Sequence, residues 1–474
     1  MRPLSAALLL AAALPAWSQG AFDPKKDFEQ KFRAQNEKAA REHVTLGKFC
    51  AGKKLHAAAL LEYRRALKLD ANCTDAKRGL SWKFEGGAWV PDPSAVVKSA
   101  NEGKPEAVEK ALDEYDQKRR TAAAKSAKEY SELAAWAAKK SLKEEAKAAW
   151  RMAWFYDSSS EEARAGSGWV RTNGYWVSPA DADARQAEAK RIAGAGAGER
   201  VAERSQVESR TGWSLAKRTS EHFRFEGMYS DAEMATLVRT AEATRLAFIE
   251  AFELPADALK EPILGVFLKT KEDHVAFLEK YAELRGRELD EHRNFAGWAK
   301  YSPDTFEVRE GGHGWALMPD WTVHQVAEFL FAAQYGIQNC PAWLREGIAY
   351  WFTYRMTSSA LTNCVSFDSA ATGGEDWEEI LEWKRLTKER LREGKSPPMR
   401  EVLEGRLNSL DGPKGVKGWS LVDWMLAARR TEFLSFLGML GGGTAPDVAI
   451  REAFGVRNDD ELEAQWAEFV LENY

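Results

Sequence analysis

Residues 324–328 read His-Gln-Val-Ala-Glu, and residues 343–347 read Trp-Leu-Arg-Glu-Gly. A spacing of four residues puts His324 and Glu328 one turn apart on the same face of a helix, where both side chains can reach one point. Gln325 follows His324, and its amide cannot accept a proton near neutral pH. Apolar residues surround Glu346, and a buried carboxylate needs a partner or a ligand. The two stretches therefore predict a pair of helices that carry His324, Glu328 and Glu346 in the interior.

Composition excludes one class of partner. The chain has 474 residues, of which 45% are hydrophobic and 29% charged, as in ordinary globular proteins. Its formal net charge is −5, and it has no long basic block. Nucleic-acid-binding proteins usually carry a basic patch, so we expect no nucleic-acid partner.

The N-terminus has the pattern of a secretory signal peptide. Arg2 precedes an apolar run from Leu4 to Leu14, and small residues occupy the positions before a cleavage site after Ser18. We therefore predict a signal peptide over residues 1–18 and a secreted or periplasmic protein. No later run of 18 apolar residues occurs, so we expect no membrane span.

Residues 46–90 align without a gap with residues 133–177, at a constant offset of 87. Fixed-period self-similarity indicates repeated structural units. In each copy the apolar residues follow a helical period, and a Gly-rich turn between two short strands follows. Matched pairs include Leu55 and Leu142, Gly79 and Gly166, Trp82 and Trp169, and Trp89 and Trp176.

The helical part of each copy resembles tetratricopeptide-like repeats. That resemblance implies two such repeats within residues 22–177, each ending in a hairpin, with peptide or protein binding as their usual role. The alternative is a structural arm without a ligand, because fold does not fix function. Residues 178–212 are rich in Ala, Gly, Glu and Arg, and predict a partly helical, then flexible, linker.

The four cysteines are an even number in a chain predicted to be exported, which favours disulfides. Cys50 and Cys73 correspond to Ala137 and Ser160 in the second copy, so both are missing there together. We therefore predict a Cys50–Cys73 bond and a Cys340–Cys364 bond. The alternative is four buried free thiols.

Residues 213–474 predict a separate α+β domain, so that the whole chain is mainly helical. Alternating or apolar strands are expected at residues 222–225, 263–268 and 306–309, and almost only helices after them. Ser230 and Glu233 have the spacing of a capping box at the start of a helix.

This order of strands, the H-x-x-x-E helix and the W-L-x-E-G helix is similar to the gluzincin-type peptidase MA superfamily. The resemblance implies a small sheet followed by helices, with zinc held by two His and by the Glu of W-L-x-E-G. His324 and Glu346 match the first and third ligands. Glu328 stands in place of the second His, and Gln325 replaces the general base.

Two of the four functional positions thus depart from the family's pattern. The first interpretation is an inactive peptidase-like protein that binds a peptide or protein, or acts as a scaffold, with His324 or Arg345 as the ion-pair partner of Glu346. The alternative is a divergent zinc-dependent hydrolase using His324, Glu328 and Glu346. We expect no catalytic residue, and either no cofactor or weakly bound zinc. In the binding interpretation, the strand near residues 306–309 is the candidate edge for an extended peptide.

Overall fold

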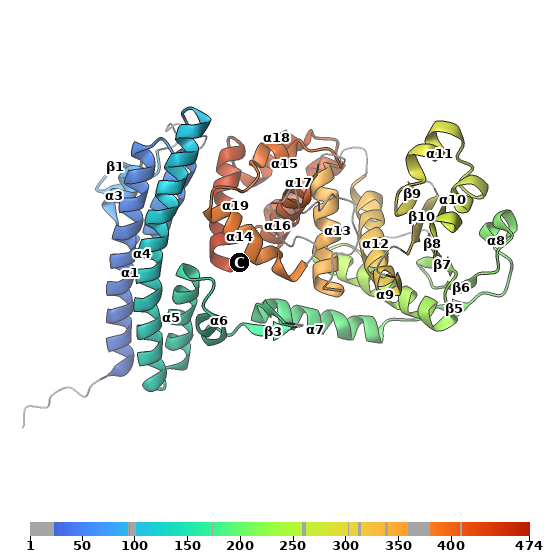
Figure 1. Ribbon diagram of the computed structural model, residues 1–474, viewed down its shortest axis with the longest axis horizontal. Coiled ribbons are helices and arrows are strands. Elements are labelled where there is room, and N and C mark those ends of the chain that lie inside the picture. The colour runs from blue at the N-terminus through green and yellow to red at the C-terminus, as the bar shows by residue number, and fades with distance from the viewer. Residues whose placement is uncertain are drawn as a thin grey trace, which may run out of the picture.

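The chain forms a helical arm at one end, a β-sheet at the other and a cluster of helices between them, as seen in the computed structural model (Figure 1). This arrangement confirms a mainly helical α+β fold. The predicted signal peptide and Cys364 lie outside the described part of the chain. The structure describes residues 23–92, 94, 101–172, 174–257, 262–301, 303–310, 314–336, 340–358, 380–407 and 410–474.

The helical arm (residues 24–177) consists of a first unit and a second unit with the same succession of elements. From the end of the first helix onward, every boundary in the second unit lies 87 residues after its counterpart. The first unit contains α1 (Pro24–Gly52), α2 (His56–Leu69), α3 (Thr74–Gly79), β1 (Lys83–Glu85) and β2 (Ala88–Val90). The second unit contains α4 (Pro105–Lys139), α5 (Lys143–Tyr156), α6 (Glu161–Gly166), β3 (Val170–Thr172) and β4 (Tyr175–Val177).

Each unit packs one aromatic ring against a glycine. A Cβ atom at Gly79 would lie 2.5 Å from the ring of Tyr63, and one at Gly166 would lie 2.4 Å from the ring of Trp150. Such distances are shorter than van der Waals contact, so only glycine fits without a shift. This contact explains why the glycine recurs at the same place in both copies.

The predicted disulfides are wrong for the described cysteines, because Cys50, Cys73 and Cys340 are free thiols. Cys50 is fully buried in the core of the first unit, and Cys73 packs against the same core from the start of α3. The ring of Tyr63 meets α1 at Gly47 and α3 at Gly79, and so fills the space between the two helices. Cys50 and Cys73 therefore share a packing environment but no bond.

Residues 178–212 differ from the predicted linker. They form α7 (Pro179–Gly194), β5 (Glu199–Arg200) and α8 (Gln206–Thr211). The side chain of Glu188 on α7 is buried, where it pairs with Arg191 and Arg355. β5 pairs with the next strand of the sheet. The helical expectation holds, but the second half is a folded edge of the C-terminal domain.

The sheet has six strands in the order β5-β6-β7-β8-β10-β9. Its centre, β7, β8 and β10, is parallel and matches the three predicted strands, whereas the outer pairings are antiparallel. Because β9 covers β10, the expectation that residues 306–309 form an edge is wrong, and β9 is the edge on that side. The remaining strands are β6 (Ala216–Thr219), β7 (Phe223–Gly227), β8 (Ile263–Leu268), β9 (Gly297–Tyr301) and β10 (Asp304–Arg309).

Helices pack against the sheet and then lead away from it. The capping box predicted at Ser230 and Glu233 is present at the start of α9 (Asp231–Phe252). A buried hydrogen bond joins α10 to the sheet, with His274 Nδ1 2.7 Å from Glu307 Oε2 and both side chains fully buried. The helices that complete this part are α10 (Lys271–Lys280) and α11 (Gly286–His292).

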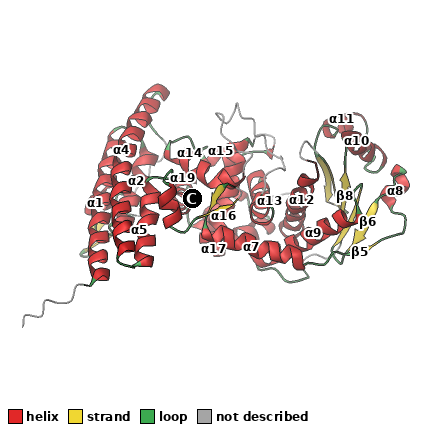
Figure 2. Ribbon diagram, turned by 60° about the horizontal axis from the view of Figure 1, so that its bottom comes forward, coloured by secondary structure: helices red, strands yellow, loops and turns green. Residues whose placement is uncertain are grey.

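After the sheet the chain runs back toward the arm, so that its last helix, α19, lies beside α2 (Figure 2). No helix in the described part of the chain is both long and apolar enough to cross a membrane. The helices are α12 (Leu317–Tyr335), α13 (Ala342–Met356), α14 (Trp383–Arg392), α15 (Met399–Leu403), α16 (Gly412–Ala428), α17 (Arg430–Gly441), α18 (Pro446–Phe454) and α19 (Asp459–Asn473), with short 3₁₀ turns at Gly314–Ala316 and Ile380–Glu382.

Candidate functional site

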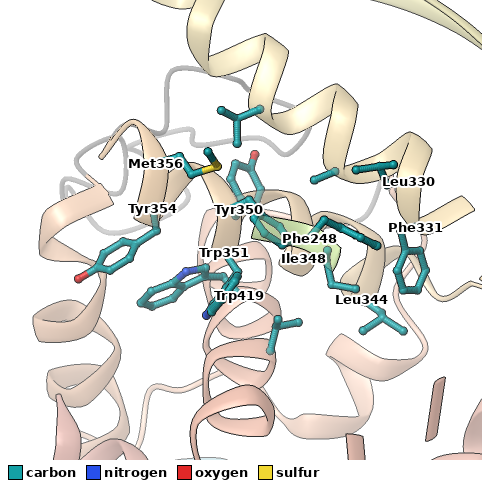
Figure 3. Packing of buried hydrophobic residues seen from close by; sticks show 14 of the residues in the cluster. Phe248, Leu330, Phe331, Leu344, Ile348, Tyr350, Trp351, Tyr354, Met356 and Trp419 are labelled. Carbon is teal, nitrogen blue, oxygen red and sulfur yellow. The ribbon is translucent and has the colours of Figure 1, made fainter. Parts of the chain in front are cut away.

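The two sequence stretches that define the candidate site lie on α12 and α13. Most of α12 is buried, because apolar residues occupy nearly every side of the helix. α13 is likewise buried over most of its length. Figure 3 shows its side chains packed among those of α9, α12 and α16, with Ile348, Tyr350 and Trp351 labelled beside Phe248, Leu330 and Trp419.

Gly347 allows α13 to lie directly against α16. A Cβ atom at Gly347 would lie 2.6 Å from the backbone oxygen of Gly418, and one at Gly418 would lie 2.9 Å from the backbone oxygen of Trp343. Backbone atoms cannot turn aside as a flexible side chain can. Glu346 is the neighbour of Gly347, so this close contact between α13 and α16 helps to position Glu346 relative to α12.

Gly347→Ala is therefore expected to lower the free energy of unfolding by about 1–3 kcal/mol, as overpacking usually does. Chemical denaturation of the purified chain measures this change. The matched control is Gly438→Ala on α17, where a Cβ atom would meet nothing within 4 Å. The control should be neutral or stabilising by up to about 1 kcal/mol, because alanine favours helix more than glycine does. Equal effects of the two substitutions would contradict the close crossing.

The structure brings the three predicted residues together. His324, Glu328 and Glu346 each offer one ligand atom, and these atoms lie within 4.8 Å of one another. His324 Nε2 lies 3.6 Å from Glu346 Oε2. The exposed fractions of the three residues are 0%, 6% and 1%, so the cluster is part of the interior.

Burial determines the charge of the histidine. It lowers the pKa of His324 to about 4, with Glu328 acting in the opposite direction and Arg345 in the same direction. The imidazole is therefore neutral at neutral pH. Trp321 and Tyr350 pack edge-on against it, with ring centroids 5.8 and 5.3 Å away. Trp321 lies three residues before His324, and Tyr350 lies four residues after Glu346. These helical spacings are the sequence signal for the two aromatic neighbours, although neither residue belongs to the motif.

Arg345 supplies the positive charge of the cluster. Its Nε atom lies 3.0 Å from Glu328 Oε1, and its Nη2 atom lies 3.9 Å from Glu346 Oε1. Burial by itself lowers the pKa of Arg345, but the carboxylates, Glu328 first, raise it above its ordinary value. Of the two candidate partners, His324 is neutral, so Arg345 is the cation that pairs with the buried carboxylates.

Gln325 leaves the cluster without a proton acceptor at the position next to His324. Its side chain is 7% exposed, and its carbonyl oxygen accepts no hydrogen bond from the residues that the structure describes. An amide cannot take a proton from water at neutral pH. General-base catalysis typically contributes about 10²–10⁴-fold in rate, and this position cannot supply it.

The donor set is compatible with zinc in part. One imidazole nitrogen and two carboxylate oxygens are ordinary zinc ligands, which bind at about 2.0–2.2 Å and so lie about 3.4 Å apart in a tetrahedron. The 3.6 Å between His324 and Glu346 fits this spacing. One oxygen of Glu328, Oε1, also faces Arg345 Nε at 3.0 Å, so a zinc ion there would share this carboxylate with the guanidinium.

Comparison with known families and proteins adds no assignment: no family model matches the chain, and no curated protein matches it. The function must therefore be argued from the chemistry of the cluster and from the surfaces around it.

Proposed function

We propose that this chain is an exported, catalytically inactive relative of the gluzincin-type peptidases that binds a peptide or protein partner. The N-terminal pattern of residues 1–18 supports export. The order of strands and helices, with H-x-x-x-E and W-L-x-E-G on adjacent helices, supports the family. The two helical units are proposed to be tetratricopeptide-like.

The observation that carries the proposal is the ion pair between Arg345 and Glu328. It gives Glu328 a cationic partner within the protein, in a cluster that lacks a general base at Gln325. A buried carboxylate is strongly stabilised by a partner of this kind. The cluster then has a structural role, and the function lies on the surfaces of the chain.

A groove between the second unit, α7 and the last helix is the proposed binding surface. Its volume is about 1090 Å³, and neither His324, Glu328 nor Glu346 lines it. Tryptophan side chains and charges of both signs share its walls, which suits a peptide with aromatic or apolar anchors and charged flanks. Its tryptophans are Trp154, Trp169, Trp351 and Trp424.

The test is a screen of the full chain against a displayed peptide library, followed by titration of the selected peptides. We expect binders with a Kd well below millimolar whose affinity falls about tenfold or more in Trp169→Ala, because an aromatic anchor in a groove is typically worth more than 1 kcal/mol. The matched surface control is Arg287→Glu on α11, a side chain that is 91% exposed and outside the groove. No binder tighter than millimolar, or binders that are indifferent to Trp169, would overturn the proposal.

A second candidate function rests on the convergence of three ligand atoms within 4.8 Å. In this reading His324, Glu328 and Glu346 hold zinc, which would supply an electrophile for hydrolysis when bound. Glu328 would have to serve both the metal and Arg345, and the proton acceptor would have to come from elsewhere in the chain. The metal content of the purified protein distinguishes the two functions.

A further inference from the structure

A second cavity lies between the helical arm and the C-terminal helices. Its volume is about 600 Å³, within the range of about 300–1,000 Å³ typical of small-molecule sites. Side chains of α1, α2 and α4 form one wall, and side chains of α14, α15 and α19 form the other. These helices stand side by side where the arm meets the rest of the chain (Figure 1).

Aliphatic side chains make up much of the wall, so the cavity suits an apolar chain. They come from both sides of the cavity, so a ligand there would be enclosed by two separate parts of the fold. Chief among them are Leu46, Leu61, Leu112, Leu391, Met399 and Leu471.

One end of the cavity is cationic. Arg65 and Arg392 lie over the same ring, Phe155, at 3.6 and 5.5 Å from its centroid. Burial, then the nearby charges of Arg119 and, more weakly, Arg65, lower the pKa of Arg392 to about 10 against the opposing effect of Glu389. The three arginines are therefore close enough to repel one another, and all three line the cavity.

The arginines are incompletely neutralised by the described residues. Arg65 pairs with Glu472 at 3.2 Å, and Arg119 pairs with Asp116. Within the described ranges, Arg392 has no carboxylate within 4.0 Å and donates only to the backbone oxygen of Phe155 and the hydroxyl of Ser158. The buried Nε atoms of Arg65 and Arg119 donate to no acceptor among the same residues. An anionic ligand group at this end would supply the carboxylate partner that Arg392 lacks among the described residues.

The acidic side chains of the cavity do not take that place. Both oxygens of Glu62 are engaged, with His43 Nδ1 at 2.5 Å and the hydroxyl of Tyr115 at 2.6 Å. Asp459 and Asp460 begin α19, whereas Glu472, the partner of Arg65, lies near its end. The rise of a helix separates these positions by roughly 20 Å. The other two carboxylates of the lining, Glu42 and Glu463, pair with Lys125 and Lys417.

The second unit shows that the polar lining is not needed to build the helices. At the offset of 87 residues, His43, Glu62 and Arg65 correspond to Tyr130, Ala149 and Met152. From the end of the first helix onward, the backbone elements have equivalent bounds in both units. The polar residues therefore belong to the cavity rather than to the fold of the repeat.

We propose that this cavity binds a long-chain carboxylate, with the apolar chain among the leucines and the carboxylate at Arg65, Arg119 and Arg392. Paired charge-assisted hydrogen bonds from guanidinium groups are the geometry that a carboxylate prefers. The proposal does not depend on the proposed peptide-binding function, because the two cavities have separate chemistry.

The experiment is calorimetric titration of the delipidated full chain with hexadecanoate below its micelle concentration. Hexadecyltrimethylammonium, with the same chain and the opposite charge, is the second probe. We expect hexadecanoate to bind and the cationic probe to bind at least about tenfold more weakly, since a hydrogen bond to a charged group contributes about 1.5–3 kcal/mol. Equal binding of both probes, or binding of neither, would overturn the proposal.

Variants then locate the site. Arg392→Gln is expected to raise the Kd for hexadecanoate about tenfold or more, and Ala58→Trp, which fills the cavity, is expected to abolish binding. Arg392→Lys keeps the positive charge, so its Kd for hexadecanoate should lie between those of the parent and of Arg392→Gln. The matched control is Arg171→Gln on the hairpin of the second unit, where the side chain is 51% exposed. Circular dichroism checks that each variant is folded. If folded Ala58→Trp binds as the parent does, the ligand is elsewhere and the proposal is wrong.

Discussion

Arg345→Met is expected to lower the free energy of unfolding by about 3–5 kcal/mol, the usual effect of removing one partner from a buried ion pair. Arg345 is the nearest cation to Glu328, at 3.0 Å, and also lies 3.9 Å from Glu346. Methionine preserves much of the side-chain length but leaves the two carboxylates without it. They would then have to take up protons or admit water. Urea denaturation of the parent and the variant measures the difference.

Two further variants make this result specific. Adding Glu328→Gln to Arg345→Met removes the negative charge of Glu328 that Arg345 no longer balances. The double variant should therefore be more stable than Arg345→Met alone. Arg287→Met removes an arginine that is 91% exposed and pairs with Glu291, so it should change stability by about 0.5 kcal/mol or less. A parent-like stability of Arg345→Met would mean that the ion pair does not hold the cluster together.

Gln325→Glu combined with Glu328→His is expected to convert the cluster into a site that holds about one zinc ion per chain. The substitutions place two His and the carboxylate of Glu346 on the two helices, with a proton acceptor at position 325. They also release Arg345 from its partner at position 328. The expected result is stoichiometric zinc after dialysis against a weak chelator, measured by mass spectrometry.

The control for this gain is His324→Ala in the restored background, which should lose the metal. Should Arg345 still compete, a further Arg345→Gln substitution would remove its charge from the neighbourhood of Glu346. A folded double variant without zinc, with or without Arg345→Gln, would argue against the proposed relation to metallopeptidases.

The sequence predicts the central strands well because their residues are apolar or alternate. Phe223 and Phe225 point into the core from β7, and the run Ile263–Leu268 is buried almost throughout. The outer strands escape prediction for a physical reason. β5 is Glu199–Arg200, and β6 reads Ala-Lys-Arg-Thr, so neither has an apolar face. β5 is an edge strand, and charged side chains are common at sheet edges, where they discourage pairing with another chain.

The candidate site is predictable in its members but not in its charge balance. A spacing of four residues is enough to place His324 and Glu328 together, and the W-L-x-E-G pattern marks Glu346. The sequence left His324 and Arg345 as equal candidates for the partner of the buried carboxylate. Only the crossing of α12 and α13 decides between them, because it buries His324 completely and puts Arg345 3.0 Å from Glu328.

The cysteines show the limit of arguments from sequence alone. Cys50 and Cys73 share one hydrophobic cluster, so their joint absence from the second copy does not require a bond between them. A disulfide requires in addition that the two sulfur atoms meet, and that depends on what packs between α1 and α3. The ring of Tyr63 fills this space.

The central claim is that Arg345, rather than a metal ion, is the cationic partner of Glu328 and Glu346. The most direct test is the metal content of the purified protein, measured by mass spectrometry beside a His324→Ala variant. We expect neither protein to contain zinc near one ion per chain. Near-stoichiometric zinc in the parent that is lost in His324→Ala would contradict the claim and favour the metallohydrolase function instead.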